Sequence, residues 1–461
     1  MGLAARQRVV AWRVHPRLAH GQARRIATAT VLWLVFLANA AVIVVLWLRG
    51  GGVSGVHHVG DLLTSLGRIT GLLGAYLLLI QVLLLARLTV LERLTGFDRL
   101  TVWHRRNGKL ALYLVLAHVV LITFGYALTD RLSLPAEASQ LLGSYPGMVT
   151  ATVGTGLLVL VVLTSLVIVR RRLRYEAWYL VHLMAYAGIV LTWFHEVPTG
   201  NEFITNPGAT AYWTVLYLAT LAVLVLFRFA LPAVQGFWYR LRVDQVIPES
   251  ASVVSLRITG RHLDRLHARA GQFFLWRFLA RGRWWEAHPF SLSAAPDGRS
   301  LRITVKHAGD FSSSIGQIRP GTAVLAEGPF GVFTDQVRRH DRVALIAGGI
   351  GITPIRALVE EMSGDLVLIY RVLHEGDLVF RAELEELARE RGIALHYVIG
   401  DHRAPGCEHL MSPEHLRQLV PDIEQREVYL CGPPAMANFI AHSVRRAGVP
   451  RTSIHTERFA L

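Results

Sequence analysis

The first half of the chain alternates long apolar runs with short polar segments. Six runs are long enough to cross the roughly 30 Å hydrocarbon core of a membrane as helices. The expected spans lie near residues 28–48, 70–90, 105–128, 148–169, 177–195 and 211–230. The pattern therefore predicts an all-α bundle of six membrane helices, with Leu231-Pro232 expected to end the last one.

After about residue 238 the pattern changes to short segments. Alternating runs at 253–258, 272–276 and 301–305, separated by Gly and Pro turns, favour a small antiparallel β-barrel. From about 335 onward, short apolar strands alternate with helical patterns, which is typical of a parallel α/β nucleotide-binding domain. The predicted organisation is a tail (1–27), a six-span domain (28–237), a barrel (238–334) and an α/β domain (335–461).

The charge distribution adds an orientation. Residues 1–237 hold 20 basic and 8 acidic residues, so most of the net charge of +15 belongs to the membrane half. This placement favours membrane topology over nucleic-acid binding. Basic residues concentrate in the N-terminal tail, in the 87–109 loop and at 170–174. The positive-inside rule therefore predicts a multi-pass protein of the cell membrane, embedded in lipid, with both termini and the two C-terminal domains in the cytoplasm.

Targeting and cysteine content narrow the class further. The first apolar run is long enough to span, so we expect a retained anchor and not a cleaved signal. The chain has only two cysteines, Cys407 and Cys431. Two thiols exclude a disulfide framework and are too few for an iron–sulfur cluster.

Four histidines lie within or at the edge of the expected membrane spans, in two widely spaced pairs. His104 and His118 are 14 residues apart on the third span, and His182 and His195 are 13 apart on the fifth. Each spacing corresponds to roughly 20 Å of helix, which suits two porphyrins stacked across the bilayer with one imidazole from each helix. Thirteen residues do not return to the same helical face, so we expect an irregularity or a loosened helix end at His195. The alternative interpretation is a set of buried polar residues or a proton relay.

The second half carries four further motifs. Gly348-Gly349-Ile350-Gly351-Ile352-Thr353-Pro354 follows a strand and precedes a helix, the context in which glycines admit a pyrophosphate. His288-Pro289-Phe290-Ser291 lies at a strand end, and the segment from Lys306 to Ser312 offers a cation, a glycine and a hydroxyl suited to a flavin pyrophosphate. Cys431-Gly432-Pro433-Pro434 follows another strand. Each motif also has an interpretation without a cofactor. The glycine, histidine and lysine motifs could be ligand-free turns, and Cys431 could be a buried structural thiol.

Together these motifs resemble the ferric reductase and NADPH oxidase superfamily, of the bacterial type, over nearly the whole chain. The resemblance implies a ferric-reductase-like membrane domain fused to a ferredoxin–NADP reductase-type module that binds FAD and NAD(P)H. It implies an inner haem held by His104 and His182, an outer haem held by His118 and His195, and b-type haems in both places.

The resemblance also implies roles for residues of the soluble half. The residues expected at the flavin are His288, Pro289, Phe290 and Ser291, with Lys306, Gly309 and Ser312 at its phosphates. The residues expected at the NAD(P)H pyrophosphate are Gly348, Gly349, Gly351, Thr353 and Pro354. Those expected near the nicotinamide are Cys431, Gly432 and Glu457, with Phe459 stacked on the flavin. Arg371 is expected at a 2′-phosphate, which favours NADPH; its alternative is a surface arginine.

One departure concerns the outer face. Superoxide-producing members resemble this chain at Arg68 but carry a second His where this chain has Ile122. Arg68 is therefore expected to pair with a haem propionate, without a complete oxygen-reduction site.

The sequence thus predicts an enzyme that passes electrons from cytoplasmic NAD(P)H through FAD and two haems to an extracytoplasmic small molecule, either dioxygen or a ferric chelate. The competing hypothesis is a membrane-anchored NAD(P)H flavin reductase without haem. A transporter is a third possibility, against which the FAD and NAD(P)H motifs argue.

Overall fold

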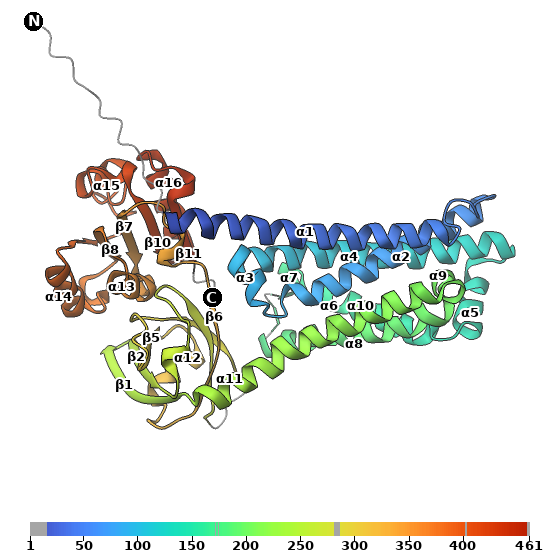
Figure 1. Cartoon of the computed structure of the whole chain (residues 1–461), viewed down its shortest axis with the longest axis horizontal. Helices are drawn as coiled ribbons and strands as arrows, with labels where there is room; N and C mark the ends of the chain where they lie inside the picture. The colour runs from blue at the N-terminus through green and yellow to red at the C-terminus, as the bar shows by residue number, and fades with distance from the viewer. Residues whose placement is uncertain (1–15, 171, 174, 281–285, 402, 459–461) are drawn as a thin grey trace, which may run out of the picture. The chain divides into compact units, whose positions relative to one another are not determined.

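A computed structural model of the chain describes residues 16–170, 172–173, 175–280, 286–401 and 403–458 (Figure 1). Residues 27–230 make one compact unit, and the chain from Leu231 onward makes another. Among the described residues, six helices are long and apolar enough to cross a membrane. These observations confirm the expected fold class of a six-span α bundle followed by an antiparallel barrel and a parallel α/β domain.

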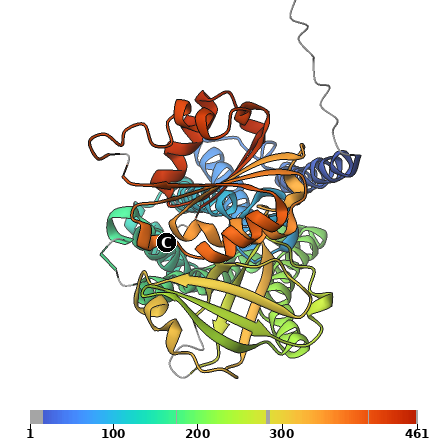
Figure 2. The same cartoon turned by 90° about the vertical axis from the view of Figure 1, so that its left-hand side faces the viewer.

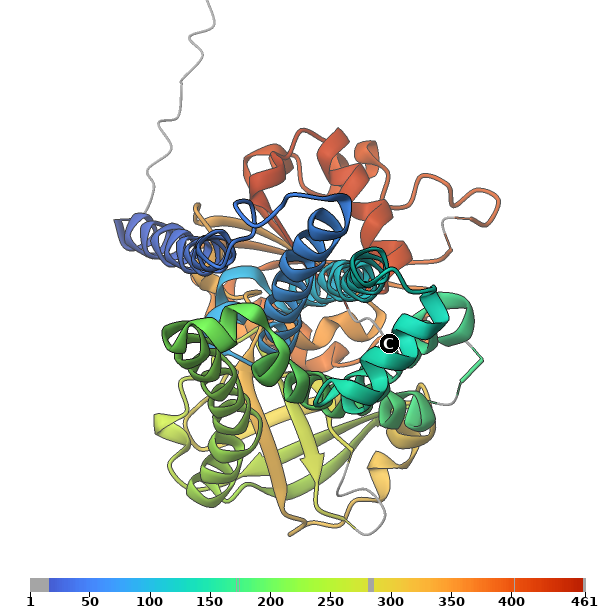
Figure 3. The same ribbon diagram turned by 90° about the vertical axis from the view of Figure 1, so that its right-hand side faces the viewer.

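The helical unit is shown with its helices roughly end-on in Figure 3. Its elements, with the short helix that follows it, are α1 (Pro16–Arg49), α2 (Val59–Leu84), α3 (Thr89–Thr95), α4 (Phe97–Asp130), α5 (Leu134–Ser144), α6 (Met148–Ser165), α7 (Val167–Arg170), α8 (Tyr175–Thr199), α9 (Asn201–Thr205), α10 (Pro207–Val225), the π-helical turn η1 (Leu226–Ala230) and α11 (Leu231–Tyr239).

Two of the expected helix boundaries are wrong. The second span begins at Val59 and not near residue 70, because both charged residues in that stretch have partners inside the protein. Asp61 accepts hydrogen bonds from the His57 and His58 N–H groups at the helix start, and Arg68 is paired with Glu202. Leu231-Pro232 does not end the helical path either. Pro232 lies in the first turn of α11, where its missing N–H is not needed, and the π-helical turn η1 precedes it.

Close packing in the helical unit occurs mainly between α2 and α4 and between α6 and α8. Glycines at the contacts allow it. A Cβ added at Gly154 would lie 2.7 Å from the Gly188 carbonyl oxygen and 3.0 Å from the Thr192 nitrogen. Small residues at helix contacts are a common way to bring backbones together in membranes, where water supplies no hydrophobic driving force.

The barrel consists of two three-stranded antiparallel sheets, ordered β1-β2-β5 and β4-β3-β6 (Figure 2). The strands are β1 (Arg242–Ser250), β2 (Val253–Thr259), β3 (Phe273–Phe278), β4 (His288–Ser291), β5 (Ser300–Lys306) and β6 (Val324–Phe330), with the short helix α12 (Asp310–Ser314) after β5. Isolated bridges Arg242–Ala323 and Leu292–Ile303 join the sheets. Alternate side chains such as Phe274, Trp276 and Phe278 are fully buried between them.

The α/β domain is a five-stranded parallel sheet in the order β11-β10-β7-β8-β9. Its strands are β7 (Arg342–Gly348), β8 (Asp365–Val372), β9 (Ala394–Ile399), β10 (Glu427–Gly432) and β11 (Ile454–Arg458). Helices α13 (Ile352–Glu361) and α14 (Arg381–Arg391) accompany one apolar cluster, and α15 (Pro413–Leu419) and α16 (Pro434–Arg446) accompany the other. Such a sheet binds ligands at the carboxyl ends of its strands.

Short 3₁₀ turns complete the described elements: η2 (Leu263–Arg265), η3 (Ile315–Gln317), η4 (Asp335–Val337), η5 (Gly349–Gly351), η6 (Glu375–Asp377), η7 (Ile423–Gln425) and η8 (Arg451–Ser453).

Two glycines of α6 provide a stability test. We expect Gly154→Ala to destabilise the helical unit by about 1–3 kcal/mol, because the added methyl meets the α8 backbone, which cannot move aside alone. Gly156→Ala is the matched control: no atom lies within 4 Å of its added Cβ, and alanine favours helix by about 1 kcal/mol. Thermal unfolding of the detergent-solubilised protein measures both. Equal midpoints for the two variants would contradict this account of the α6–α8 contact.

Candidate functional site

The two histidine pairs face each other between α4 and α8. The ring centres of His104 and His182 are 6.0 Å apart with planes inclined by 46°, and those of His118 and His195 are 6.1 Å apart and inclined by 47°. The rings are half-buried. The two pairs therefore repeat nearly the same geometry at two levels of the same two helices.

Each of the four imidazoles is held at its Nδ1 atom by an oxygen. The contacts are His104–Gln81 carbonyl at 3.2 Å, His118–Gly67 carbonyl at 2.8 Å, His182–Ser165 hydroxyl at 3.3 Å and His195–Thr192 carbonyl. A carbonyl only accepts, so in three of the rings Nδ1 donates its hydrogen. The neutral ring then carries its lone pair on Nε2, which is the usual arrangement of a metal-ligating histidine oriented by a second contact.

The separation of the rings suits one metal ion between them. Two metal–nitrogen bonds of about 2 Å, with about 1 Å from each nitrogen to its ring centre, place paired imidazoles about 6 Å apart. Among the described residues, no group of three or more His, Cys, Asp or Glu side chains could hold a metal ion. Each pair offers two imidazoles, a donor set that could hold the iron of a haem.

The expected loosened end at His195 is wrong. The helix α8 continues through Pro198 to Thr199. Pro198 cannot donate a backbone hydrogen bond, but the Thr199 hydroxyl bonds to the His195 carbonyl and keeps the last turn closed. The 13-residue spacing is thus accommodated by a continuous helix.

Arg68, expected at a haem propionate, is engaged by another group. Its Nε donates to Glu202 Oε1 at 2.8 Å, and its Nη2 donates to the Gly50 carbonyl at 2.8 Å. Glu202 is almost fully buried. Glu202 lies 134 residues away on α9, and no pattern in the sequence connects the two residues.

Ile122 packs against α2 at Gly67. A Cβ added at Gly67, the residue before Arg68, would lie 2.8 Å from the Ile122 side chain. The Ile122 side chain therefore fills this contact with hydrocarbon, at the position where the resemblance implies a second histidine in superoxide-producing members.

The barrel motif forms the edge strand β4. Ser291 is buried, while the His288 ring stacks on Phe311 with centres 3.7 Å apart and planes inclined by 21°. Phe290 lies nearly parallel to Phe311 at 6.3 Å. Pro289, which pairs with Leu275 of β3, completes the strand. Phe311 of α12 is thus an aromatic partner of this motif that the sequence interpretation missed.

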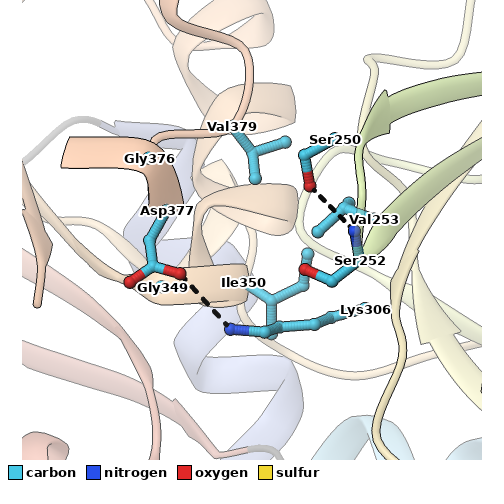
Figure 4. Close-up of a pocket in the computed structure, with 9 residues that line it drawn as sticks. All are labelled: Ser250, Ser252, Val253, Lys306, Gly349, Ile350, Gly376, Asp377 and Val379. Atoms are coloured by element: carbon cyan, nitrogen blue, oxygen red, sulfur yellow. Dashed lines mark hydrogen bonds and ion pairs between the residues drawn. The ribbon is translucent and has the colours of Figure 1, made fainter. Parts of the chain in front are cut away.

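Lys306 and Gly349, expected at different cofactors, line the same pocket (Figure 4). The Lys306 amine lies 4.0 Å from the Asp377 carboxylate, which comes from η6 of the α/β domain. Ser250, Ser252 and Val253 line the barrel side of the pocket. A cation and a glycine turn therefore meet where the two domains adjoin.

Gly309 and Ser312 form a local turn. The Ser312 hydroxyl accepts from the Ala308 N–H at 2.8 Å and from the Gly309 N–H at 3.0 Å. In this structure the Ala308 and Gly309 N–H groups are thus both bonded to Ser312 itself.

The glycine motif after β7 and the Cys-Gly-Pro-Pro motif after β10 lie side by side. Ala347 is in register with Cys431, and Cys431 is in register with Glu457 of β11. A Cβ at Gly351 would run into the Cys431 carbonyl, and one at Gly348 would strike Met436. Gly349 has φ +52°, a left-handed conformation that favours glycine.

The remaining members of these motifs complete the turn. The Thr353 hydroxyl donates to the Ile350 carbonyl at 3.1 Å, and Pro354 is buried near the start of α13. Gly432, at the end of β10, lies against Gly348. The parallel sheet thus brings the expected pyrophosphate and nicotinamide residues to one edge.

Two charged or reactive groups of this domain are buried. Burial raises the pKa of the Cys431 thiol, and the Glu457 carboxylate raises it further. Arg371 on β8 is 7% exposed and donates to the Gly400 carbonyl at 3.3 Å, so the surface-arginine alternative is wrong. Phe459 lies outside the described residues.

Comparisons with known proteins match three domain families in this order. Residues 70–193 match the ferric reductase like transmembrane component, 240–334 match an FAD-binding domain and 345–442 match an oxidoreductase NAD-binding domain. The chain is therefore a fusion of the ferric reductase/NADPH oxidase type. It combines six helices that are long and apolar enough to cross a membrane with an FAD-binding domain and an oxidoreductase NAD-binding domain.

Individual relatives match the soluble half. The ferredoxin reductase component of 3-ketosteroid-9-alpha-monooxygenase is 27% identical over 229 residues in Rhodococcus rhodochrous and 31% identical over 233 in Mycolicibacterium smegmatis. Each match covers 48% of this chain and less than two thirds of the relative, 64% and 65% respectively. The FAD/NAD-binding domain of nitric oxide dioxygenase from Vibrio cholerae is 24% identical with a TM-score of 0.40, over 48% of this chain and 98% of that one.

The two cysteines should differ in reactivity. The thiolate is the nucleophile, so the raised pKa of Cys431 keeps it as an unreactive thiol at pH 8, while the partly exposed Cys407 reacts. We expect brief iodoacetamide treatment of the native protein to label Cys407 alone, as measured by peptide mass spectrometry. Unfolding in denaturant before labelling is the control and should expose both residues. Equal labelling of the native protein would show that Cys431 is accessible.

Proposed function

We propose that this protein passes electrons from cytoplasmic NAD(P)H through FAD and two b-type haems to an acceptor on the opposite side of the cell membrane. The observation that carries the proposal is the repeated histidine geometry, with two imidazole pairs about 6 Å apart on α4 and α8. When bound, these groups supply conversion of a hydride into single electrons and electron transfer over the width of the bilayer.

The chain's own histidines would hold both haem irons. His104 and His182 are assigned to the inner haem, and His118 and His195 to the outer haem. Backbone carbonyls of Gln81, Gly67 and Thr192 orient three of the rings. Three of the four holding contacts come from the polypeptide backbone itself, so the ligand orientation is tied to the helix packing.

The soluble residues bind and orient the nucleotides. The turn from Gly348 to Pro354 is assigned to the NAD(P)H pyrophosphate, because η5 and the start of α13 lie at the carboxyl edge of the sheet. His288, Pro289, Phe290 and Ser291 are assigned to the flavin, with Lys306, Gly309 and Ser312 near its phosphates. Cys431, Gly432 and Glu457 are assigned to the nicotinamide side, and Phe459 is assigned to the flavin ring.

Arg371 supports NADPH over NADH. Its guanidinium is buried at the end of β8, beside the β9 carboxyl end, where the 2′-phosphate of a nucleotide bound to a doubly wound sheet would lie. Burial lowers the pKa of this arginine, and the Asp401 carboxylate offsets only part of that effect. Arginine side chains in proteins keep their positive charge at neutral pH.

Removing single histidines tests the haem assignment. We expect the purified protein to hold two haems. His118→Ala should lose the outer haem and His182→Ala the inner haem, because the affected iron would keep only one histidine ligand. Haem content by the pyridine haemochrome method and reduced-band spectra measure the loss. His57→Ala, in an exposed loop, is the control that should retain both haems. A wild-type protein that oxidises NAD(P)H with a dye yet holds no haem would overturn the proposal in favour of an anchored flavin reductase.

The outer face favours a ferric chelate over dioxygen as the acceptor. Ile122 replaces the second histidine of the superoxide-producing relatives, and Arg68 is already neutralised by Glu202. Sealed vesicles with NADPH supplied to the side of the nucleotide domains should yield ferrous iron in the opposite compartment, with little superoxide there. Superoxide formation without ferric reduction would reverse this choice of acceptor. Product on the NADPH side alone would contradict transmembrane transfer.

A further inference from the structure

A charged cluster joins the barrel to the α/β domain, close in sequence to the two cofactor motifs. Arg302 of β5 makes two parallel bonds with Glu383 of α14, each 3.0 Å long. Arg356 of α13 donates to the same carboxylate at 2.6 Å. One glutamate thus receives both guanidinium groups, one from each domain. We call Arg302, Arg356 and Glu383 the interdomain clasp.

The two arginines of the clasp also donate hydrogen bonds to the backbone just after the flavin motif. The Ser293 carbonyl accepts from Arg302 at 3.0 Å and from Arg356 at 2.9 Å. Ser293 lies two residues after Ser291, and Arg356 lies three residues after Thr353. The segments assigned to the flavin and to the NAD(P)H pyrophosphate are therefore connected through one carbonyl oxygen and one side chain.

The surroundings make the clasp rigid. The Arg356 and Arg302 side chains are 8% and 17% exposed, and both guanidinium groups lie over the Phe380 ring. Glu360 of α13 adds a second contact between the two domains. It pairs with Arg356 at 2.8 Å and accepts a hydrogen bond from the Ala295 N–H of the barrel. Planar guanidinium groups that bond in pairs and stack on a ring define direction as well as distance.

The charge state of the carboxylate agrees with this geometry. Burial alone would raise the pKa of Glu383, but the Arg302 bond and the charges of both arginines outweigh burial and lower it. The glutamate is therefore ionised throughout the neutral pH range, and its replacement by a neutral residue would leave two arginines facing each other.

We propose that Arg302, Arg356 and Glu383 are positioning residues for hydride transfer, which set the separation of nicotinamide and flavin by fixing β4 against α13. The inference rests on the proposed NAD(P)H-to-FAD reaction. In that step a C–H bond of the reduced nicotinamide breaks. The hydrogen leaves as a hydride, with both electrons of that bond, and forms a new covalent bond to the flavin. The nicotinamide is oxidised and the flavin is reduced by two electrons. The rate of such a step depends steeply on the approach of the two reacting atoms.

The test uses the full-length protein in detergent. Transhydrogenation from NADPH to thio-NADP⁺ follows hydride transfer through the flavin without requiring the haems. We expect Glu383→Gln to slow this reaction about tenfold, because a small displacement of the nicotinamide is enough for such a loss. The KM for NADPH should stay within about twofold, because none of the three clasp residues is among those assigned to the nucleotide. The deuterium isotope effect with NADPH labelled at C4 should rise, since hydride transfer becomes more rate-limiting.

Controls separate positioning from folding. Glu385→Gln, on the same helix and in an exposed pair with Arg381, should leave all three quantities unchanged. Glu383→Asp, which keeps the charge, should recover part of the rate. Bound FAD is measured for every variant, and Arg302→Met is the second variant if Glu383→Gln does not fold. An unchanged rate and isotope effect, or a rate loss that merely follows FAD loss, would overturn the inference. Wild-type protein without any NADPH-dependent transhydrogenation would instead overturn the proposed reaction itself.

Discussion

The distance between the histidine rings of α4 and α8 is the constraint on which the membrane unit depends. Neither helix packs mainly on the other: α4 lies against α2, and α8 lies against α6. Glycines on α2 and α6 allow those two contacts to be close, so each histidine-bearing helix has its own rigid support. The 6 Å ring separation is therefore determined by two helix pairs, not by direct packing of α4 on α8.

The same principle of backbone support recurs around the rings. A neutral histidine in a membrane loses water, so its N–H needs an acceptor within the protein. The acceptors are mostly carbonyls of residues on the same or a neighbouring helix, including Gly67 beside His118. Gly71 lies directly against that ring, since an added Cβ would come within 2.5 Å of its Nδ1. The same contacts of α2 with α4 therefore both pack the two helices and orient the His118 ring.

Sequence patterns predicted the parts of this structure that depend on local periodicity. The alternating runs at 253–258, 272–276 and 301–305 agree with β2, β3 and β5 to within two residues, because their alternation and flanking turns are strong. The second span was misplaced because Asp61 and Arg68 look like loop residues until their partners are known. Glu202, Phe311 and Glu383 were missed for the same reason: each acts through a contact with a segment far away in the chain. The assignment of the four histidines to haems remains a prediction.

The charged contacts of the two units differ in what they can do. In the membrane unit, Arg68 and Glu202 neutralise each other, and replacement of either would leave an uncompensated buried charge, which is costlier than the pair is stabilising. That pairing holds α2 to α9 and the turn at Gly50 and neutralises the Arg68 cation. In the soluble unit, two arginines share Glu383 and bond to a backbone carbonyl as well. The Arg68–Glu202 pair joins two helices of one unit. The cluster around Glu383 instead fixes the orientation of the FAD-binding barrel relative to the NAD-binding domain.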